Sequence, residues 1–499
     1  MNQIHESKAA ELELARYGLL VQGADSNVSF TGLSNNSRQT QSGDLFICKG
    51  FGFKPEYLHM AAQRGAVAYM AEAAVDGASL PFIQVSDCRK AQSILARWFY
   101  GNPSDAFTLV GVIGTKGKTT TTYMTHAVMN AVAGQHTGMT SGVDLDMGGA
   151  SVESHLTTPE SLDLQRLYAQ ARDHKLPIVT SEISSQAYKV DRVYGQHFDY
   201  GIFLNISPDH ISPSEHPDFA DYFECKLQML DNSDVAVICR DTDEFETVYA
   251  RAKAACKQVC LVGKTEDCDY RFHDVVKQPS GYRFLVSEKA TGETHAYSII
   301  MDGQYNIKNA VAAIAVGRMM GGDPAKIAQE LQSVTVAGRA DVYTCGDLTV
   351  IINYMHNGIS CTEALLGLQQ DYPGAYIVVV IGMAGERSAG RFVDIGHVCG
   401  QYADRVIFSS EDPGFDDPLT VAQQMADAAA DGKAEVIVEI DRTKAVEQAI
   451  LDAPKGALVV LAGKGNETTM RVRGEYIPYE SDPGIMRRVT PIREQMYSK

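Results

Sequence analysis

The stretch over 107–122 combines residue types that can bind phosphate. An apolar, β-type run ends at Ile113, a glycine-rich turn follows, and a helical pattern begins at Lys118. Glycines let backbone N–H groups approach an anion, and the helix N-terminus adds partial positive charge, so this order is typical of a phosphate-binding loop. Lys118 would reach the outer phosphates of a nucleotide, and the Thr119 hydroxyl would ligate Mg²⁺. The structural alternative is a glycine turn of an ordinary α/β protein.

Two further apolar runs, over 176–183 and 200–206, are typical of buried parallel strands, and each ends in polar residues. Glu182 ends the first run, and His210 closely follows the second. Ligands of open parallel sheets bind beyond the carboxyl ends of the strands. We therefore predict that Glu182 and His210 serve a magnesium–nucleotide. The structural alternatives are a helix-terminal charge for Glu182 and a capping or core histidine for His210.

Length and composition limit the class of protein. At 499 residues the chain is too long for one ordinary core, and its 45% hydrophobic and 21% charged residues are typical of a globular protein. A net charge of −18 argues against a nucleic-acid binder and against binding to an anionic membrane. The ten cysteines show no Cys-x-x-Cys pair and so indicate neither a disulfide framework nor a cysteine zinc site.

The N-terminus favours a cytoplasmic protein. It is of mixed charge and lacks an apolar signal region, and no apolar run reaches the roughly 18 residues that suggest a membrane span. We expect no membrane insertion.

The rhythm of the chain predicts an α/β protein of three domains. A small N-terminal α/β domain is expected over 1–103, a central domain with the phosphate loop and a parallel sheet over 104–336, and a Rossmann-like C-terminal domain over 337–499. Turn residues at 101–104 mark the first boundary. Beyond 336, short strands alternate with helical stretches, which is typical of a doubly wound sheet. An antiparallel hairpin is expected over 281–301.

Six short motifs match one known family in their order. They are Gly-Thr-Lys-Gly-Lys-Thr-Thr at 114–120, Leu-Thr-Thr-Pro-Glu at 156–160, Glu-Ile-Ser-Ser-Gln-Ala at 182–187, Asn-Ile-Ser-Pro-Asp-His at 205–210, Gly-Arg at 338–339 and Ala-Gly-Lys-Gly at 462–465. With them the chain resembles the Mur ligase family, which builds the peptide of bacterial peptidoglycan, over nearly its whole length. Ser-Arg at 37–38 and Gly-Asp-Leu-Phe at 43–46 resemble the uridine-binding N-terminal domain of the branch that adds the third residue.

The resemblance implies an ATP-dependent amide ligase. Such an enzyme joins UDP-N-acetylmuramoyl-L-alanyl-D-glutamate to an amino acid, with ATP and Mg²⁺ as cofactors. A carboxylate is first phosphorylated to an acyl phosphate, which the incoming amine then attacks. Negative charge gathers on two converging anions, so cations and hydrogen-bond donors must be fixed in place. We expect the UDP-muramoyl-dipeptide and L-lysine as partners, no nucleic acid, and a monomer.

The resemblance also implies roles for individual residues. The expected ATP contacts are Gly114, Thr115, Lys116, Gly117, Lys118, Thr119, Thr120, Asn309, Arg339 and Asn353. The expected contacts of the UDP-peptide are Ser37, Thr157, Thr158, Ser184 and Arg192. The expected metal ligands are Thr119, Glu182, His210 and Lys226, the last three of which join Lys118 as the catalytic set. Lys226 matches a lysine that is carbamylated in many of these ligases, and a carbamate would convert this cation into an anionic metal ligand. The structural alternative is a surface helix lysine.

The loop over 411–418 bears on the choice of amino acid. Diaminopimelate-adding members carry an arginine there that clamps the far carboxylate of their substrate, whereas this chain has Gly414 and several carboxylates. An acidic pocket favours a side chain that ends in an ammonium, so the chain resembles the L-lysine-adding branch. Arg387 would bind the α-carboxylate of the amino acid, Asp412 would read its side chain, and Glu467 would meet an ammonium. The structural alternative is a solvated surface turn.

Other functions stay open at this point. Asn353 stands where the family has an aspartate, and an asparagine keeps an acceptor but carries no charge. A non-catalytic homologue that binds the UDP-muramoyl-peptide is therefore one alternative. The nearest enzyme alternative adds ornithine or meso-diaminopimelate. A folate polyglutamylating ligase shares the phosphate loop but would not be expected to carry the N-terminal domain.

Overall fold

The computed structural model describes residues 4–50, 52–154, 156–209, 211–212, 215–336, 339–385 and 389–497. These residues fall into two compact units, the first of which ends at Cys260 while the second continues from Leu261. The apolar cores of the N-terminal sheet and of the C-terminal sheet each lie within one unit. Within the described part of the chain, no helix is long and apolar enough to span a bilayer.

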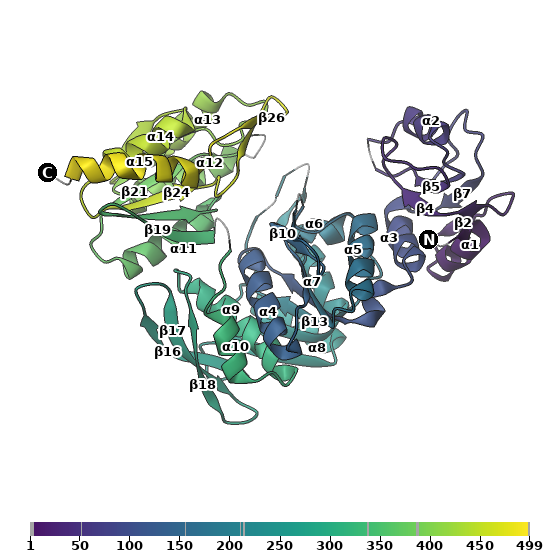
Figure 1. The fold of residues 1–499 in the computed structure, drawn as a ribbon, viewed down its shortest axis with the longest axis horizontal. Coiled ribbons are helices and arrows are strands. Elements are labelled where there is room, and N and C mark those ends of the chain that lie inside the picture. Colours follow the sequence, from purple (N-terminus) through teal and green to yellow (C-terminus); the bar gives the residue numbers. More distant parts are fainter. Residues whose placement is uncertain are drawn as a thin grey trace. The chain divides into compact units, whose positions relative to one another are not determined.

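The first unit begins with a small sheet in the order β2-β7-β6-β5-β4. Its strands are β2 (Leu20–Gln22), β4 (Gly32–Ser34), β5 (Asp44–Ile47), β6 (Ala68–Ala71) and β7 (Phe82–Val85). All but β2 run parallel. Helices α1 (Ser7–Arg16) and α3 (Cys88–Phe99) cover one face, and α2 (Pro55–Gln63) covers the other (Figure 1). Because both faces are covered, successive residues of β5 are all buried. Two short strands, β1 (His5–Glu6) and β3 (Ser29–Phe30), form a separate antiparallel pair.

The central sheet of the first unit follows the order β11-β10-β9-β12-β8-β13-β14-β15. Its strands are β8 (Thr108–Ile113), β9 (Gly138–Thr140), β10 (Asp144–Asp146), β11 (Val152–Glu153), β12 (Ile178–Glu182), β13 (Phe198–Phe203), β14 (Ser233–Cys239) and β15 (Gln258–Gly263). The run from β9 to β14 is parallel, and β10 and β11 are antiparallel at the edge. The carboxyl ends of β12, β8 and β13 therefore meet at one edge, as the two apolar runs predict.

Short and long helices connect these strands. They are the 3₁₀ turn η1 (Pro103–Ala106) and the α-helices α4 (Lys118–Ala133), α5 (Ser161–Asp173), α6 (Ser185–Lys189), α7 (Phe219–Asp231) and α8 (Phe245–Ala255). Helix α4 begins directly after the glycine-rich loop, so the strand–loop–helix prediction is confirmed.

The second unit opens with an antiparallel ribbon. It consists of β16 (Tyr270–Lys277), β17 (Tyr282–Glu288) and β18 (Thr294–Ile299), followed by α9 (Tyr305–Met319) and α10 (Pro324–Leu331). Strands β17 and β18 pair from Tyr282↔Ile299 to Ser287↔Thr294, which confirms the hairpin predicted over 281–301.

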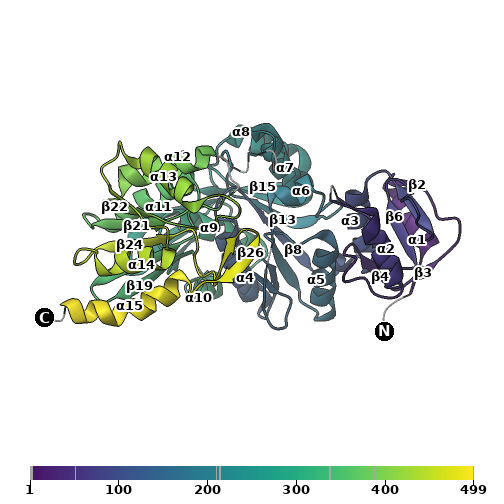
Figure 2. The ribbon, with the colours of Figure 1, turned by 90° about the horizontal axis from the view of Figure 1, so that it is seen from above.

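The C-terminal sheet of the second unit has the order β19-β20-β24-β21-β22-β23 in the described residues. The strands are β19 (Arg339–Cys345), β20 (Leu348–Asn353), β21 (Ile377–Ile381), β22 (Arg405–Phe408), β23 (Glu435–Val438) and β24 (Leu458–Ala462). All but the edge strand β19 are parallel. Figure 2 shows β22, β21, β24 and β19 following one another in this order.

Helices cover both faces of the C-terminal sheet. One layer contains α11 (Gly358–Asp371), α12 (Ala389–Tyr402) and α13 (Pro418–Ala429), and the other contains α14 (Arg442–Leu451) and α15 (Asp482–Tyr497). A small hairpin, β25 (Thr469–Val472) with β26 (Glu475–Pro478), precedes α15. The doubly wound prediction is confirmed. The domain boundaries at 103 and 336 stay predictions.

Candidate active site

Two hydrogen bonds between Lys116 and Asn205 fix the loop between β8 and α4 against the end of β13. The backbone N–H of Lys116 donates to Asn205 Oδ1 at 2.8 Å, and Asn205 Nδ2 donates back to Lys116 O at 3.1 Å. Gly117 has φ +80°, which favours glycine, and a Cβ on Gly114 would lie 2.9 Å from Leu204 Cβ. The glycines thus allow a tight turn whose backbone lies next to the N-terminus of α4.

Glu182 accepts hydrogen bonds from the start of α4 and from the turn before β10. The residue is 2% exposed, and its Oε1 accepts a hydrogen bond from Thr119 Oγ1 at 3.0 Å. Its other oxygen, Oε2, accepts from the backbone N–H of Gly142 at 2.8 Å. A hydroxyl and a carboxylate side by side are oxygen donors of the kind that Mg²⁺ prefers. The residues present therefore fit a magnesium ion.

Lys226 lies on α7 and is buried, with 1% of the residue exposed. Its Nζ donates to Gly114 O at 2.7 Å and lies 4.6 Å from the ring centroid of Tyr222. Burial lowers the pKa of Lys226 well below its usual value, and the charge of Lys118 lowers it further. The alternative of a surface helix lysine is wrong. A lysine with a lowered pKa supplies the neutral amine that nucleophilic chemistry requires.

Two more lysines belong to the loop and to the first turn of α4. Lys118 Nζ donates to Thr115 O at 3.1 Å, and Lys116 Nζ pairs with Asp209 Oδ2 at 3.1 Å. Both lysines lower the pKa of Lys226, whereas Asp209 raises it. The loop is therefore a place where positive charge gathers.

The predicted UDP-peptide residues form a hydrogen-bonded group behind Glu182. Thr158 Oγ1 donates to Glu182 O at 3.0 Å and accepts from the backbone N–H of Ser184 at 3.0 Å. The Ser184 side chain caps α6 by accepting from Ala187 N. Arg192 Nη1 donates to Thr158 O at 3.1 Å. The structure thus brings Thr158, Ser184 and Arg192 together.

Two further members of this group, Glu160 and Lys49, are not among the predicted site residues. Glu160 Oε1 pairs with Arg192 Nε at 2.9 Å, and Glu160 Oε2 pairs with Lys49, which follows β5 of the N-terminal sheet. Burial raises the pKa of Glu160, but Lys49 and Arg192 outweigh it and hold that pKa below its usual value. The motif at 156–160 ends in this glutamate and was the signal that could have found it.

Thr157 and Ser37 occupy other positions in the first unit. A Cβ on Gly142 would lie 3.6 Å from Thr157 Oγ1, so Thr157 lies beside the Gly142–Glu182 contact. Ser37 is buried in the turn that follows β4 of the N-terminal sheet.

Asn205, Asp209 and Tyr222 are positioning residues that the list of predicted site residues lacks. Tyr222 OH donates to Thr115 Oγ1 at 3.1 Å, and that oxygen also accepts from Ser207 N at 3.1 Å. Tyr222 precedes Lys226 by four residues on α7 and therefore shares its helix face. The motif at 205–210 pointed to Asn205 and Asp209.

The remaining predicted ATP contacts belong to the second unit. Asn309 is buried on α9, where its Nδ2 donates to Asn306 Oδ1 at 3.0 Å. Asn353 ends β20 opposite Arg339 of β19, and its backbone oxygen accepts from Gly463 N at 3.1 Å. His210, Arg387 and the Arg339 side chain lie outside the described residues.

The carboxyl ends of β22 and β24 bring Asp412 and Glu467, two of the three predicted amino-acid residues, together. Lys464 is 1% exposed, and its Nζ pairs with Asp412 Oδ1 at 2.9 Å and with Glu467 Oε2. Asp412 Oδ1 also accepts from Arg471 N at 2.7 Å. One ammonium thus serves two carboxylates.

Glu411 adds a third carboxyl, which belongs to the acidic loop but is not among the predicted site residues. It is buried, and within the described residues its Oε2 has no hydrogen-bond partner. Burial raises the pKa of Glu411 to about 7, although Arg442 opposes the rise. A Cβ on Gly463 would collide with Glu411 Oε2, so the glycine after β24 makes room for this carboxyl.

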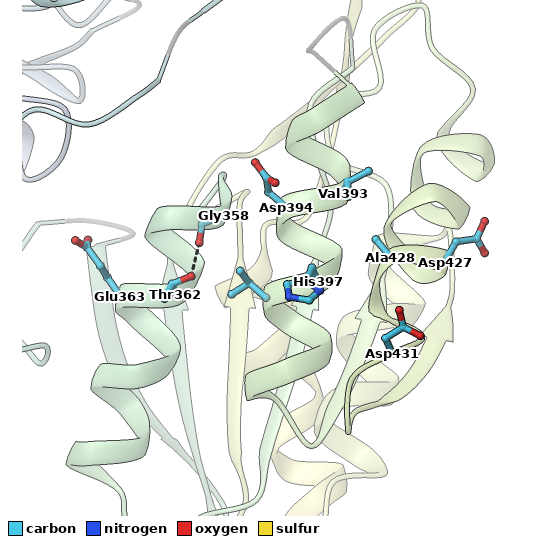
Figure 3. A pocket seen from close by; sticks show the side chains of 10 residues that line it. Gly358, Thr362, Glu363, Val393, Asp394, His397, Asp427, Ala428 and Asp431 are labelled. Atoms are coloured by element: carbon cyan, nitrogen blue, oxygen red, sulfur yellow. Dashed lines mark hydrogen bonds between the residues drawn. The ribbon is translucent and has the colours of Figure 1, made fainter. Parts of the chain in front are cut away.

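A hollow of about 570 Å³ between α11, α12 and α13 is separate from these groups. None of the predicted site residues lines it. Figure 3 shows the carboxylates of Glu363 and Asp427 pointing to opposite sides, while Thr362 Oγ1 donates to Gly358 O at 2.9 Å. The acidic side chains do not converge on a common point there.

Two protein-family models match separate ranges of the chain. The model of the Mur ligase middle domain matches residues 112–317, and that of the Mur ligase glutamate ligase domain matches residues 338–465. A UDP-N-acetylmuramyl-tripeptide synthetase of Latilactobacillus sakei is 37% identical over 93% of this chain and 94% of its own length. A UDP-N-acetylmuramoyl-L-alanyl-D-glutamate--L-lysine ligase of Enterococcus faecalis is 34% identical over 91% of this chain and 90% of its own.

A solved structure has the same fold at low identity. The MurF ligase of Thermotoga maritima in complex with ADP superimposes with a TM-score of 0.61. The match covers 93% of this chain and 97% of that one at 18% sequence identity.

Proposed function

The chain belongs to the Mur ligase family of ATP-dependent ligases, and we propose that it adds L-lysine to UDP-N-acetylmuramoyl-L-alanyl-D-glutamate in peptidoglycan precursor synthesis. The observation that carries the lysine assignment is the cluster of Glu411, Asp412 and Glu467 around the single ammonium of Lys464. A second ammonium would balance this excess of negative charge. The name of the Enterococcus faecalis relative supports the same amino acid.

The phosphate loop supports the ATP half of the proposal. Backbone N–H groups at the start of α4 and the Lys118 ammonium would bind the phosphates of ATP. Thr119 and Glu182 would hold Mg²⁺, with His210 as a further ligand by family likeness. The ion, when bound, would supply positive charge against the phosphate oxygens. The remaining proposed ATP contacts, Asn309, Arg339 and Asn353, rest on the family motifs.

The proposed reaction has two steps, phosphoryl transfer and then amide formation. The substrate carboxylate attacks the γ-phosphorus of ATP, the bond from that phosphorus to the β–γ bridging oxygen breaks, and ADP leaves. The amine of lysine then attacks the acyl carbon, the carbon–oxygen bond to phosphate breaks, and the amine loses a proton. Lys116 and Lys118 place positive charge at the loop, where anions must approach one another.

Lys226 has a proposed second role as a carbamate. Its lowered pKa keeps a larger share of the amine neutral, and a neutral amine can add CO₂ and lose a proton. The resulting anion, next to Gly114, would place a negative charge close to the proposed magnesium site.

Gly414 supports lysine over diaminopimelate. It has φ +59°, and its N–H donates to Arg471 O at 3.1 Å. An arginine in that backbone conformation would cost about 1–2 kcal/mol. The backbone therefore disfavours the side chain that would clamp a second carboxylate.

A panel of amino acids tests the function. The purified protein would be given ATP, Mg²⁺ and UDP-N-acetylmuramoyl-L-alanyl-D-glutamate with L-lysine, L-ornithine or meso-diaminopimelate, and phosphate release and product mass would be measured. We expect strong turnover with L-lysine that is lost in Lys118→Ala. Turnover with diaminopimelate but not lysine would overturn the lysine assignment. No turnover with any of the three would favour a non-catalytic binding protein.

The same proposal describes a monomer in the cytoplasm. Light scattering after size-exclusion chromatography tests the monomer, and a mass of two chains would contradict it.

A further inference from the structure

Two histidines and an aspartate of the first unit meet beside α4. His126 lies on α4, His136 follows that helix, and Asp146 ends β10. One ligand atom from each lies within 4.8 Å of the others. His136 Nε2 lies 3.0 Å from Asp146 Oδ1, and the two imidazole rings are 5.6 Å apart at 81°. Residues ten and more positions apart in sequence therefore offer three potential metal ligands at one place.

The partners of His126 favour the tautomer that a metal ion needs. The buried Thr137 hydroxyl donates to Asn130 Oδ1 at 2.8 Å, so its oxygen is left to accept from His126 Nδ1 at 3.1 Å. The lone pair then lies on Nε2, which has a long contact of 3.4 Å to Asn130 Nδ2. A ligating histidine commonly donates its other N–H to an oxygen in this manner. Burial also lowers the pKa of His126, although Asp146 opposes the shift.

We propose that His126, His136 and Asp146 bind one divalent transition-metal ion of the zinc class, with solvent in the remaining position. Two imidazoles and a carboxylate suit zinc and its neighbours, whereas Mg²⁺ prefers ligands that are all oxygen. The site is thus distinct from the proposed magnesium site at Thr119 and Glu182. The His136 side chain is 48% exposed, which gives an ion access from solvent.

The other candidate clusters of the described residues are occupied by protein groups. Glu288 and Glu293 hold the guanidinium of Arg318. His216 lies fully buried between Ser185 and Asp221, and burial raises the pKa of the neighbouring Cys225 to about 11.

A metal ion bound at this site would restrain the segment over 142–146, which also contacts the phosphate-loop region. Strand β10 carries Asp144, which accepts from Tyr123 OH of α4. Just before it, Gly142 N donates to Glu182 Oε2. An ion held by His126 and Asp146 would tie α4 to β10 and so favour one position of Gly142. The metal site stands independently of the ligase assignment, since its test measures binding.

Zinc and cobalt titration of the full chain tests the proposal. The protein would be purified with a tag that contains no histidine, stripped with a chelator, and titrated with ZnCl₂ by calorimetry in excess Mg²⁺. We expect one ion per chain. Co²⁺ should give visible d–d absorption without a thiolate charge-transfer band, because no cysteine belongs to the proposed ligand set. Absence of stoichiometric binding, or a thiolate band, would overturn the proposal.

Matched variants locate the ion. His136→Ala and Asp146→Asn should each weaken zinc binding at least tenfold and abolish the rise of Tm that zinc gives the wild type. His197→Ala is the control, since His197 Nε2 pairs with Asp234 Oδ1 at 3.0 Å on the surface of the same unit. It should bind zinc as the wild type does. Unchanged affinity in His136→Ala and Asp146→Asn, with metal-free Tm and circular dichroism preserved, would refute this ligand set.

Discussion

The phosphate loop of the first unit and the strand-end cluster of the second have opposite charge. Around the loop, the side chains of Lys118 and Lys226 donate to backbone oxygens, and the ammonium of Lys116 pairs with Asp209. In the second unit, carboxyl groups surround the ammonium of Lys464. Both sites follow the carboxyl ends of parallel strands. The residues after the strands, and not the topology, therefore decide whether an anion or a cation is favoured.

The partners of the charges differ as well. Lys226 is buried against a neutral carbonyl, so its positive charge is costly and its pKa falls. Lys464 is equally buried but lies between two carboxylates, which stabilise its charge. Burial by itself therefore does not decide the chemical outcome, because the groups that surround the buried lysine differ between the two sites.

Removal of a loop cation should have the largest effect. Lys118→Ala is expected to lower phosphate release by on the order of 10³-fold, since a donor aimed at developing charge is lost. Steady-state phosphate release with L-lysine measures it. Lys257→Ala, on an exposed lysine paired with Asp234, is the control and should retain activity. Activity within a few fold of wild type in Lys118→Ala would refute the role of this loop.

Lys226 tests whether the buried amine is itself needed. Lys226→Met keeps the volume but not the nitrogen, and we expect a loss on the order of 10²-fold, as for a lost catalytic group. Short carboxylates such as acetate should restore part of the activity of Lys226→Ala if a carbamate is the working form. Full activity in both variants, with Tm unchanged, would remove Lys226 from the mechanism.

A smaller effect is expected in the carboxylate-rich site. Asp412→Ala should raise the KM for L-lysine about tenfold, which corresponds to about 1.4 kcal/mol, and should change the KM for ATP much less. Asp431→Ala, on an exposed carboxylate after α13, is the matched control. Equal changes in both KM values would show that Asp412 does not read the amino-acid side chain.

Glu411 should make the stability of the folded protein depend on pH. Its pKa, raised to about 7, means that the folded state holds a proton that the unfolded state has already released above about pH 4.5. Stability therefore falls as pH rises from about 4.5 to 7. Glu411→Gln removes this dependence and should be more stable than wild type at pH 8, by on the order of 1 kcal/mol. Urea unfolding at pH 5 and pH 8 measures it, and identical pH profiles would contradict the prediction.

Much of the fold could be predicted because its signals are local. The β8–loop–α4 unit follows from an apolar run, glycines and a helical pattern that are adjacent in sequence. The hairpin of β17 and β18 and the alternation of the C-terminal sheet follow from short periodic segments. The end of a predicted strand also placed Glu182 at the carboxyl edge of its sheet, where the structure has it.

The sequence by itself determined which side chains stand at the strand ends and in the phosphate loop, since a few neighbouring residues decide that. Only the tertiary structure decided what those side chains meet. Lys226 contacts Gly114 from 112 residues away, and Glu411 lies buried against Gly463. His126 and Asp146 come together only through the pairing of β9 and β10 beside α4. Burial and charge balance depend on residues distant in sequence, and these set the protonation state and hence the chemistry of each group.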